Sequence, residues 1–567
     1  MTNEIKPDSP ANDELAAQRT WFTRFLDVIE WLGNLLPHPV TLFAMFAGGV
    51  VLLSGLAGWM DWSAVDPRPE GASGRAPDGI ITSISLLNGA GLRMIVENLV
   101  TNFTGFVPLG TVLVALLGVG VAEASGLISA AIRGLVLKAA SFRPFVPGKS
   151  DGSIFARAYR QLLKVVNFLL TPKILVTITI VFSGVVSNTA SEMGYVVLVP
   201  LAAVVFLALG RHPLAGMAAA FAGVSGGYSA NLLIGTVDPL LAGITEEAAQ
   251  LIDPGYLVHP AVNWYFMMVS TFLITIVGSW VTLKIVEPKL GKYDPSIASE
   301  DLSDDRSMEP LTAEEVRGLK WAGVGVLGVS MLLVLSVAPE WGVLRNPDTG
   351  DVLNSPFLRG MVTLIFVFFF VPGFIYGKVV GTMNSDRDVI DGMAKAMSSL
   401  GLYIVLVFFA AQFVAFFGWS NLGPIIAVKG AEFLKAINLT GPLVFVPFIL
   451  MCCFVNLMLG SASAQWAITA PIFVPMLMLI GYSPEVIQAA YRIGDSTTNI
   501  ITPMMSYFGL ILAFATRYDR KLGIGTIISM MLPYTIFFLI GWIILFYVWV
   551  FGLGMPVGPE APTYYIP

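Results

Sequence analysis

The sequence predicts an all-α polytopic membrane protein with nine transmembrane helices and two re-entrant hairpins arranged in inverted repeats. Of its 567 residues, 56% are hydrophobic and only 12% are charged, whereas a soluble domain carries about 25% charged residues. Apolar runs of about 20 residues, long enough to cross a bilayer, recur along the whole chain. The two halves also share a pattern of interrupted apolar segments. These observations exclude a soluble enzyme and a single-span receptor.

The chain divides into a polar N-terminal segment, a membrane domain and a short tail. The first twenty residues are polar and acidic and lack an apolar core, so the first crossing is expected to act as the targeting signal. The crossings follow one another with short connections, which predicts a single transport domain. The expected divisions are a cytoplasmic segment at 1–36, the membrane domain at 37–556 and an external tail at 557–567.

Eleven apolar segments make up the predicted membrane domain. Two of them carry a polar, small-residue break in the middle, and we interpret these, at about 170–209 and 440–482, as hairpins that enter and leave on the same side. The other nine segments are expected to cross the membrane, at roughly 37–60, 104–126, 213–250, 262–287, 319–338, 359–381, 397–419, 484–515 and 523–551.

The distribution of basic residues predicts the orientation. Cytoplasmic loops carry an excess of Lys and Arg, and residues 133–164, after the second crossing, hold seven of them. In the loop at 61–103, acidic residues outnumber basic ones, which places that loop outside. The N-terminus is therefore expected in the cytoplasm and the C-terminus on the opposite side.

The two halves resemble each other around their hairpins. In the first half, a polar tip at 187–192 is followed by Val199-Pro200 and by a crossing interrupted at 226–231. In the second half, a tip at 460–466 is followed by Val474-Pro475 and by a crossing interrupted at 494–499. The predicted topology places the halves in opposite orientations. Inverted repeats with paired broken helices are typical of secondary transporters.

A broken helix has a direct physical consequence in a bilayer. It frees backbone NH and C=O groups at mid-membrane depth, where a cavity, an ion or a ligand must satisfy them. Freed NH groups favour anions, and freed carbonyls favour Na⁺ or protons. The alternative interpretation is that Gly, Ser and Thr are there to allow close packing of helices.

Two ionisable residues share the second broken helix. Arg492 and Asp495 are three residues apart, so on a helix they lie on one face and can form an internal salt bridge. In the functional interpretation, Arg492 receives a carboxylate or sulfonyl group of the substrate. Asp495 then holds a cation together with Asn456 and the hydroxyls of Ser496 and Thr497.

Three further residues have two interpretations each. Glu192 at the first hairpin tip either titrates or binds Na⁺, or it reaches cytoplasmic water. Asp238 precedes Pro239 and either belongs to the site or only caps the following half-helix. Trp466 either stacks on an aromatic substrate or packs within its hairpin.

Several stretches together resemble the p-aminobenzoyl-glutamate transporter (AbgT) family of bacterial inner-membrane proteins, over about 37–559. The resemblance implies nine crossings and two hairpins in a bowl-shaped homodimer, with a scaffold region and a mobile transport core. It also implies cation-coupled transport of p-aminobenzoyl-glutamate or export of sulfonamide antimetabolites. The stretches that carry it are Gly210-Arg211-His212-Pro213, Ser229-Ala230-Asn231-Leu232-Leu233-Ile234, Asn263-Trp264-Tyr265-Phe266, Ala470-Pro471-Ile472-Phe473-Val474-Pro475 and Arg492-Ile493-Gly494-Asp495-Ser496.

The resemblance also implies roles for individual residues. It places Asn456 and Asp495 at a Na⁺ site and Ser463 at the second hairpin tip. It expects an acidic residue at position 192, which is Glu here where the compared relative has Asp, and it indicates that 144–170 is longer than usual. The residues that it places along the substrate path are Trp466, Pro484, Arg492 and Pro503.

The expected partners are a small-molecule substrate, the lipid bilayer and a second copy of the chain, with no nucleic acid. No cofactor is expected beyond Na⁺ as a coupling ion. Cys452 and Cys453 are adjacent, so neither a disulfide nor a zinc site is predicted, and no Walker-type loop indicates ATP as energy source. Secondary site candidates are Ser187, Asn188, Asn231, Asp238, Ser496 and Asn499.

Three other functions were weighed. A sodium-coupled dicarboxylate carrier of similar architecture is suggested by Ser187-Asn188-Thr189. An intramembrane hydrolase could use Ser463 or Ser496, but no His lies in a predicted membrane core to act as its base. A channel is the third alternative. The sequence leaves the direction of transport and the choice between Na⁺ and H⁺ open.

Overall fold

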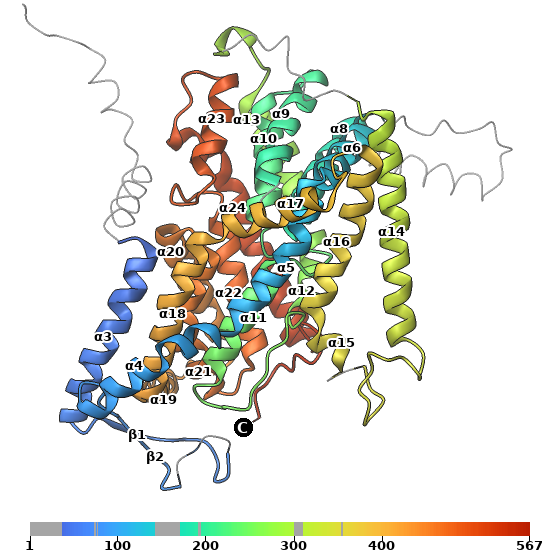
Figure 1. The fold of residues 1–567 in the computed structure, drawn as a ribbon. Coiled ribbons are helices and arrows are strands. Elements are labelled where there is room, and N and C mark those ends of the chain that lie inside the picture. Colours follow the sequence, from blue (N-terminus) through green and yellow to red (C-terminus); the bar gives the residue numbers. More distant parts are fainter. Residues whose placement is uncertain are drawn as a thin grey trace, which may run out of the picture.

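The part of the chain that the structure describes is predominantly helical, as predicted (Figure 1). The computed structural model describes residues 37–141, 171–190, 194–299, 310–352 and 355–566, except 73, 74 and 76. The described strands are β1 (Ser63–Val65) and β2 (Ile80–Thr82), which pair antiparallel with Ser63 opposite Thr82. Three predictions lie outside the described residues: the segment at 1–36, the stretch at 144–170 that was expected to be longer than usual, and Glu192.

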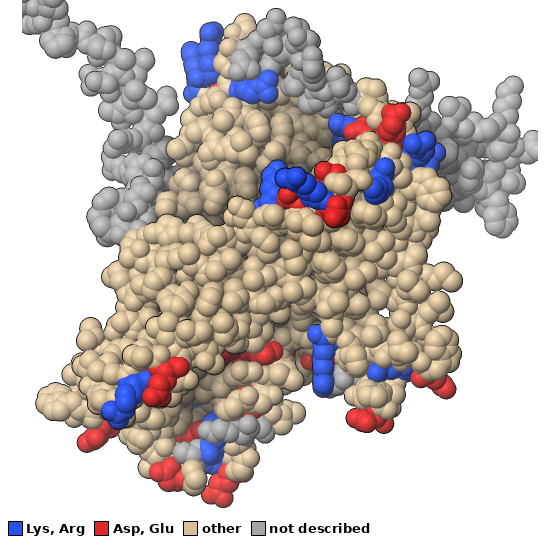
Figure 2. Space-filling model, in the orientation of Figure 1, with Lys and Arg blue, Asp and Glu red and all other residues tan. Residues whose placement is uncertain are grey.

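Among the described residues, eight helical spans are long and apolar enough to cross a membrane. Charged side chains gather at the two ends of the molecule and leave a broad uncharged band between them (Figure 2). The prediction of a polytopic membrane protein is confirmed, while the number of crossings stays a prediction. The helices of these spans are α3 (Pro39–Trp59), α4 (Gly89–Thr104) with α5 (Val107–Ala124), α12 (Trp264–Val281) with α13 (Glu287–Leu290), α14 (Ala313–Val337), α16 (Met361–Val380), α18 (Gly401–Trp419), α20 (Phe445–Leu459) and α24 (Ile524–Phe546).

Both predicted hairpins contain a pair of helices. In the first half, α8 (Pro172–Ser187) precedes the tip, and η2 (Gly194–Leu198) with α9 (Val199–Ala208) follows it. In the second half, α20 ends at Gly460, whose φ of 58° reverses the chain into α21 (Ala462–Met478). A side chain at Gly460 would also collide with the backbone of Met504. That the two hairpins are re-entrant stays a prediction.

Both predicted broken helices are interrupted. The first consists of α10 (Pro213–Phe221), the π-helical turn η3 (Ala222–Gly226), an irregular stretch and α11 (Val237–Ala249). The second consists of α22 (Pro484–Thr498) and α23 (Phe508–Tyr518). The predicted break at 494–499 is wrong in position, because the helix continues through Thr498 and the irregular stretch is 499–507.

Gly494 explains the misplaced break. A Cβ atom at this position would lie 2.5 Å from Cys452 Cβ and 2.7 Å from the carbonyl oxygen of Ile449. The glycine therefore allows α22 to approach α20, which is the packing interpretation of such residues. It does not interrupt the helix.

Among the described residues, four helices of more than ten residues lie in connections where none was predicted. Residues 89–104 of the predicted external loop at 61–103 form α4, and the others are α6 (Leu127–Ala140), α17 (Asp386–Ser399) and α19 (Leu422–Ala436). Their charged residues interrupt the apolar runs on which the prediction depended. Caps start two of them: Asn88 accepts a hydrogen bond from the Gly91 NH group, and Ser385 forms a capping box with Asp388.

The helices form an inner and an outer group. The inner group comprises the two hairpins, the two broken helices, α12 and α24, and all fifteen residues of α22 are buried in it. The outer group comprises α3, α5, α14, α16 and α18. In it, α14 packs on α16 and α16 on α5, and α5 contacts α11 of the inner group. In Figure 1, α3 and α14 stand at the two edges of the molecule.

Glycines bring α5 and α16 together at backbone distance. A Cβ atom at Gly373 would lie 2.7 Å from the Cα atom of Ala122, and one at Gly118 would collide with the carbonyl oxygen of Phe366. The two helices therefore touch main chain to main chain.

Candidate functional site

The two broken helices and the second hairpin tip surround a polar cavity of about 160 Å³. Its wall includes Gly460–Ser463 of the hairpin tip and Asn499 of the second break. Three tyrosines also line it: Tyr195 after the first tip, Tyr228 in the first break and Tyr507 in the second break. The predicted candidates Ser463 and Asn499 thus lie at one cavity, to which both halves contribute.

A hydrogen bond joins the two broken helices directly. The backbone NH group of Ser229, freed by the first break, donates to the hydroxyl of Ser496 on α22 at 3.0 Å. Both residues are buried. An unpaired NH group at this depth would cost about 1–3 kcal/mol. The Ser496 hydroxyl therefore satisfies a backbone group of the opposite half, as expected for a protein-lined interruption.

Asn456 connects the second hairpin to the end of α22. Its Nδ2 atom lies 2.6 Å from the carbonyl oxygen of Asp495, 3.0 Å from Thr498 Oγ1 and 2.8 Å from Asn499 Oδ1. Because a backbone carbonyl only accepts, Nδ2 must face Asp495, and the amide oxygen points elsewhere. This buried Oδ1 atom has no hydrogen-bond partner.

The Asp495 carboxylate is fully buried, and neither of its oxygens has a hydrogen-bond partner. A buried carboxylate requires a proton, a cation or an ion-pair partner. Together with Asn456 Oδ1 it supplies unsatisfied oxygens of the type that an alkali cation takes as ligands. The residues fit the predicted cation site. Within the described residues, no cluster of three His, Cys, Asp or Glu side chains could hold a metal.

Arg492 forms an ion pair that the sequence did not indicate. Its Nη1 atom lies 2.6 Å from Asp238 Oδ1 at the start of α11, and the two side chains are only 4% and 3% exposed. The contact is one of charge, since Asp238 Oδ1 takes part in no hydrogen bond. The internal pair with Asp495 is thus not the ion pair that the structure shows.

Asp238 does not cap α11, whose N-cap is Thr236, but it contacts the backbone just before that helix. Its Oδ2 atom accepts a hydrogen bond from the NH group of Gly235 at 2.6 Å, just before α11. Its Oδ1 atom neutralises Arg492. The residue therefore orders the end of the first break and ties it to the second broken helix.

The first hairpin tip satisfies the first break in a similar way. Asn188 Nδ2 donates to the carbonyl oxygens of Val224, at 2.9 Å, and Gly227, at 3.3 Å. Thr189 donates to Asn231 Oδ1 at 2.9 Å. Ser187 is used locally, because its hydroxyl donates to the carbonyl oxygen of Gly184.

Trp466 does not reach the polar cavity. Its side chain is fully buried, stacks on Tyr491 with ring centroids 4.2 Å apart, and donates from Nε1 to Thr245 Oγ1 at 2.8 Å. Thr245 in turn donates to Gln488 Oε1, and Gln488 donates to Asn263 Oδ1. The structure supports the packing interpretation: Trp466 anchors the second hairpin to α11 and α22.

The two predicted prolines mark helix boundaries. Pro484 is the first residue of α22, after Ser483 as its N-cap. Pro503 is half-buried in the second break, beside Thr502, whose hydroxyl donates to the carbonyl oxygen of Leu457. Neither is part of the cavity wall named above, and both shape the elements that form it.

The cavity tyrosines were missed by the sequence analysis. Tyr195 and Tyr507 stack nearly parallel, with centroids 4.7 Å apart and an angle of 3° between the rings. The stack joins the first hairpin to the second break. Tyr228 within the first predicted break and Tyr195 three residues after the first predicted tip were the available signal, since an aromatic ring with a hydroxyl suits a boundary between apolar and polar surroundings. Tyr507 lies eight residues beyond the second predicted break, so its position gave no such signal.

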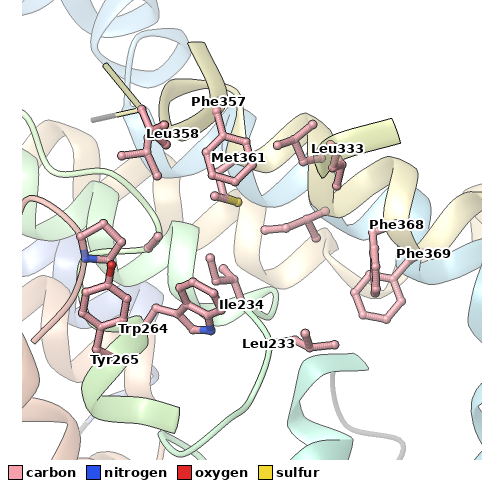
Figure 3. A pocket seen from close by; sticks show the side chains of 15 residues that line it. Leu233, Ile234, Trp264, Tyr265, Leu333, Phe357, Leu358, Met361, Phe368 and Phe369 are labelled. Atoms are coloured by element: carbon pink, nitrogen blue, oxygen red, sulfur yellow. The ribbon is translucent and has the colours of Figure 1, made fainter. Parts of the chain in front are cut away.

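A second cavity, of about 320 Å³, differs in chemistry from the first (Figure 3). It lies between the inner and the outer group, where Trp264 of α12 and Leu233 of the first break face Phe357, Met361 and Phe368. Its lining is almost entirely apolar. The polar groups that a hydrophilic solute requires therefore gather at the other cavity.

Comparison with known proteins agrees with this architecture. A sequence profile of the AbgT putative transporter family matches residues 24–143 and 158–565. The p-aminobenzoyl-glutamate transport protein of Escherichia coli is 36% identical over 532 residues, which cover 94% of this chain and 95% of that protein. The profile passes over 144–157, within the stretch that was predicted to be longer than usual.

Two transporters of known structure share the fold. The Alcanivorax borkumensis YdaH transporter, described as having an unusual topology, is 44% identical, with a TM-score of 0.79 over 92% of this chain and all of that one. Neisseria gonorrhoeae MtrF, described as illuminating a class of antimetabolite efflux pumps, is 57% identical, with a TM-score of 0.84 over 95% of this chain and all of that one.

Proposed function

Because the chain belongs to the AbgT putative transporter family, we propose that it is a cation-coupled secondary transporter of p-aminobenzoyl-glutamate or of related aromatic amide and sulfonamide antimetabolites. The Escherichia coli relative supports the first substrate class. The likeness to MtrF supports efflux as the direction of net transport. We further propose a homodimer in the bacterial inner membrane, with its N-terminus in the cytoplasm.

The polar cavity is the observation that carries this proposal. It lies where both broken helices and the second hairpin meet, and it combines aromatic rings with hydroxyl and amide groups. A benzoyl ring can stack on Tyr228 or Tyr507. The hydroxyls of Ser461 and Ser463 can donate to an amide or carboxylate oxygen. This pairing of surfaces suits an aromatic amide better than a small aliphatic dicarboxylate.

Coupling to a cation is supported by Asp495 and Asn456. Both residues have oxygens without hydrogen-bond partners. Asn499 links them to the cavity, because it contacts Asn456 and also lines the cavity. A cation or proton bound between Asp495 and Asn456 would thus be separated from the solute by one residue, Asn499. Such adjacency provides a route by which one ligand alters the affinity for the other.

An assay of net flux into proteoliposomes tests the proposal. Radiolabelled p-aminobenzoyl-glutamate would be followed with and without a Na⁺ gradient, and with and without a proton gradient. Asp495→Asn is expected to lower gradient-dependent flux by about tenfold or more, since a charged ligand of the cation is lost. Asp391→Asn, at an exposed carboxylate on α17, is the matched control and should transport normally.

Several outcomes would contradict the proposal. Flux that persists unchanged after both gradients are collapsed would exclude cation coupling. Succinate that competes while p-aminobenzoyl-glutamate does not would favour a dicarboxylate carrier. Currents far above carrier turnover would indicate a channel, and cleaved p-aminobenzoyl-glutamate would indicate a hydrolase.

A further inference from the structure

The apolar cavity between the inner and the outer group (Figure 3) offers almost nothing that a polar ligand could bind. Among its described lining residues, only Trp264 and Tyr265 carry a polar side-chain group. The Trp264 indole NH already donates to the carbonyl oxygen of Leu232 at 2.9 Å. An ordered water needs about two to four polar partners, and the carboxylates of p-aminobenzoyl-glutamate would be buried here unpaired. The lining therefore favours an occupant that is itself apolar.

The cavity is bordered by side chains that the protein leaves uncovered. Leu233 in the first break lines it and is 42% exposed. Leu333 lines it from α14, where its neighbours Leu332 and Val334 are 66% and 59% exposed. Both α14 and α16 are long and apolar enough to cross a bilayer, so lipid hydrocarbon surrounds this face of the molecule. A lipid tail can therefore enter between the two groups and reach Leu233.

A positive charge lies beside one end of the cavity. Arg359 is the last residue of α15 (Pro356–Arg359), and it directly follows Leu358, which lines the cavity. The Arg359 side chain is exposed, and it forms no ion pair in the part of the chain that the structure describes. In Figure 1, α15 lies at the same end of the molecule as the C-terminus. A guanidinium at the end of a membrane span is well placed to bind the phosphate of a lipid headgroup.

An acyl chain would contact both groups of helices at once. The cavity has a volume of about 320 Å³, and an empty space of that size would deprive its lining of dispersion contacts. An acyl chain also changes its conformation when the two walls shift, whereas a protein side chain is fixed to one of them. The residues that would contact the chain are Leu233 and Trp264 of the inner group and Phe357 and Phe368 of the outer group.

We propose that each chain binds one phospholipid here, with an acyl chain in the apolar cavity and the phosphate at Arg359. The acyl chain contacts Leu233 in the first break, the same irregular stretch that lines the polar cavity through Tyr228. The lipid therefore touches an element of the solute site without entering it. Binding requires neither the coupling ion nor the solute, so this site is independent of the proposed function.

Photolabelling of the full-length protein in nanodiscs tests this. The probe is phosphatidylglycerol with a diazirine on one acyl chain, and mass spectrometry of the digested protein locates the cross-links. In the wild type they are expected within 357–369 and at Leu233. Leu364→Trp narrows the cavity and should lose these cross-links, and Arg359→Gln should need several-fold more probe for half-maximal labelling. Leu332→Trp is the matched control, because this exposed leucine on α14 lies outside the cavity, and it should label as the wild type does.

Cross-links confined to exposed residues of α14 would show bulk lipid alone and overturn the proposal. Cavity labelling that persists in Leu364→Trp would overturn it too, and so would displacement of the probe by p-aminobenzoyl-glutamate, which would make the cavity a solute site. An Arg359→Gln variant that labels as the wild type does would overturn the contact with the phosphate. Gel filtration verifies that each variant is folded, and Leu333→Trp, which narrows the cavity from α14, replaces Leu364→Trp if that variant does not fold.

Discussion

Arg492 on α22 and Asp238 at the start of α11 form a buried ion pair, 2.6 Å between Nη1 and Oδ1, that joins the two halves of the repeat. The two side chains are only 4% and 3% exposed, so bulk solvent cannot replace either partner. Asp238→Asn should therefore destabilise the protein by about 3–5 kcal/mol, because it leaves Arg492 buried and uncompensated. Thermal unfolding of detergent-solubilised protein, followed by loss of the monodisperse peak, measures this.

A double variant separates the pair from its surroundings. Asp238→Asn combined with Arg492→Gln should be more stable than Asp238→Asn alone, since no lone charge remains. Lys429→Gln provides the control, because the Lys429–Glu432 pair is exposed and should contribute less than about 1 kcal/mol. Equal losses in all three variants would contradict the structural role of the buried pair.

Trp466 should affect stability more than substrate affinity. Trp466→Phe keeps a ring against Tyr491 but removes the hydrogen bond to Thr245 and part of the buried ring volume, so we expect a loss of about 1–3 kcal/mol and an unchanged Kd for p-aminobenzoyl-glutamate. Trp466→Ala should lose about 3–5 kcal/mol through the cavity it leaves. A large rise in Kd for the Phe variant, with normal stability, would instead place Trp466 in direct contact with the substrate.

Tyr507, in contrast, should affect substrate affinity more than stability. It lines the polar cavity and stacks on Tyr195, and aromatic contacts of this kind contribute about 0.5–1.5 kcal/mol. Tyr507→Ala is expected to weaken binding of the aromatic substrate by about two- to tenfold, whereas Tyr507→Phe keeps the ring and most of the affinity. Isothermal titration with p-aminobenzoyl-glutamate distinguishes them, and equal affinities for wild type and Ala would remove Tyr507 from the site.

Gly494 should tolerate no larger residue. Gly494→Ala brings a methyl group to 2.5 Å from Cys452 Cβ, and overpacking of this kind costs about 1–3 kcal/mol. Gly323→Ala on α14 has open space around the new methyl group and should be neutral or stabilising by up to about 1 kcal/mol. The difference between their unfolding temperatures checks the close approach of α22 and α20.

The ion pair of Asp66 and Arg68, between β1 and β2, predicts a pH dependence. Burial opposes it, but hydrogen bonds from Arg68 and its charge lower the pKa of Asp66 below its usual value. A lowered folded-state pKa stabilises above the unfolded value, near 3.9, and the stabilisation is lost as pH falls through the folded pKa. The difference in unfolding temperature between wild type and Asp66→Asn should be constant from pH 8 to 5 and shrink below about pH 4. A difference that grows on acidification would contradict the lowered pKa.

The sequence predicted the class of protein and the elements that form the site, because both depend on local composition. Apolar runs locate helices, and clusters of Gly, Ser, Thr and Asn locate interruptions. The same clusters misplaced the second break, because Gly494 serves helix packing and not chain reversal. The shared Val-Pro pattern has a similar ambiguity: Pro200 lies at the start of α9, whereas Pro475 lies inside α21.

The partners of the buried polar groups could not be predicted. Arg492 is three residues from Asp495, and local spacing favoured that pair, but the ion pair forms with Asp238, which the fold brings from the other half. The hydrogen bond from Ser229 to Ser496 and the stack of Tyr195 on Tyr507 also join distant segments. Amphipathic helices such as α17 were missed because their charges interrupt the hydropathy on which the prediction depended.

The contact between α5 and α16 constrains how such a molecule can move. Gly373 lies against Ala122, and Gly118 lies against Phe366. Sliding either helix along the other would therefore bring its main chain against a Cβ atom of the facing helix, where there is no glycine to make room. These helices must shift together, as one rigid wall. Displacement can occur more easily where only side chains meet, along the apolar cavity between α12 and α16. The cavity there leaves space between the inner and the outer group for such a displacement.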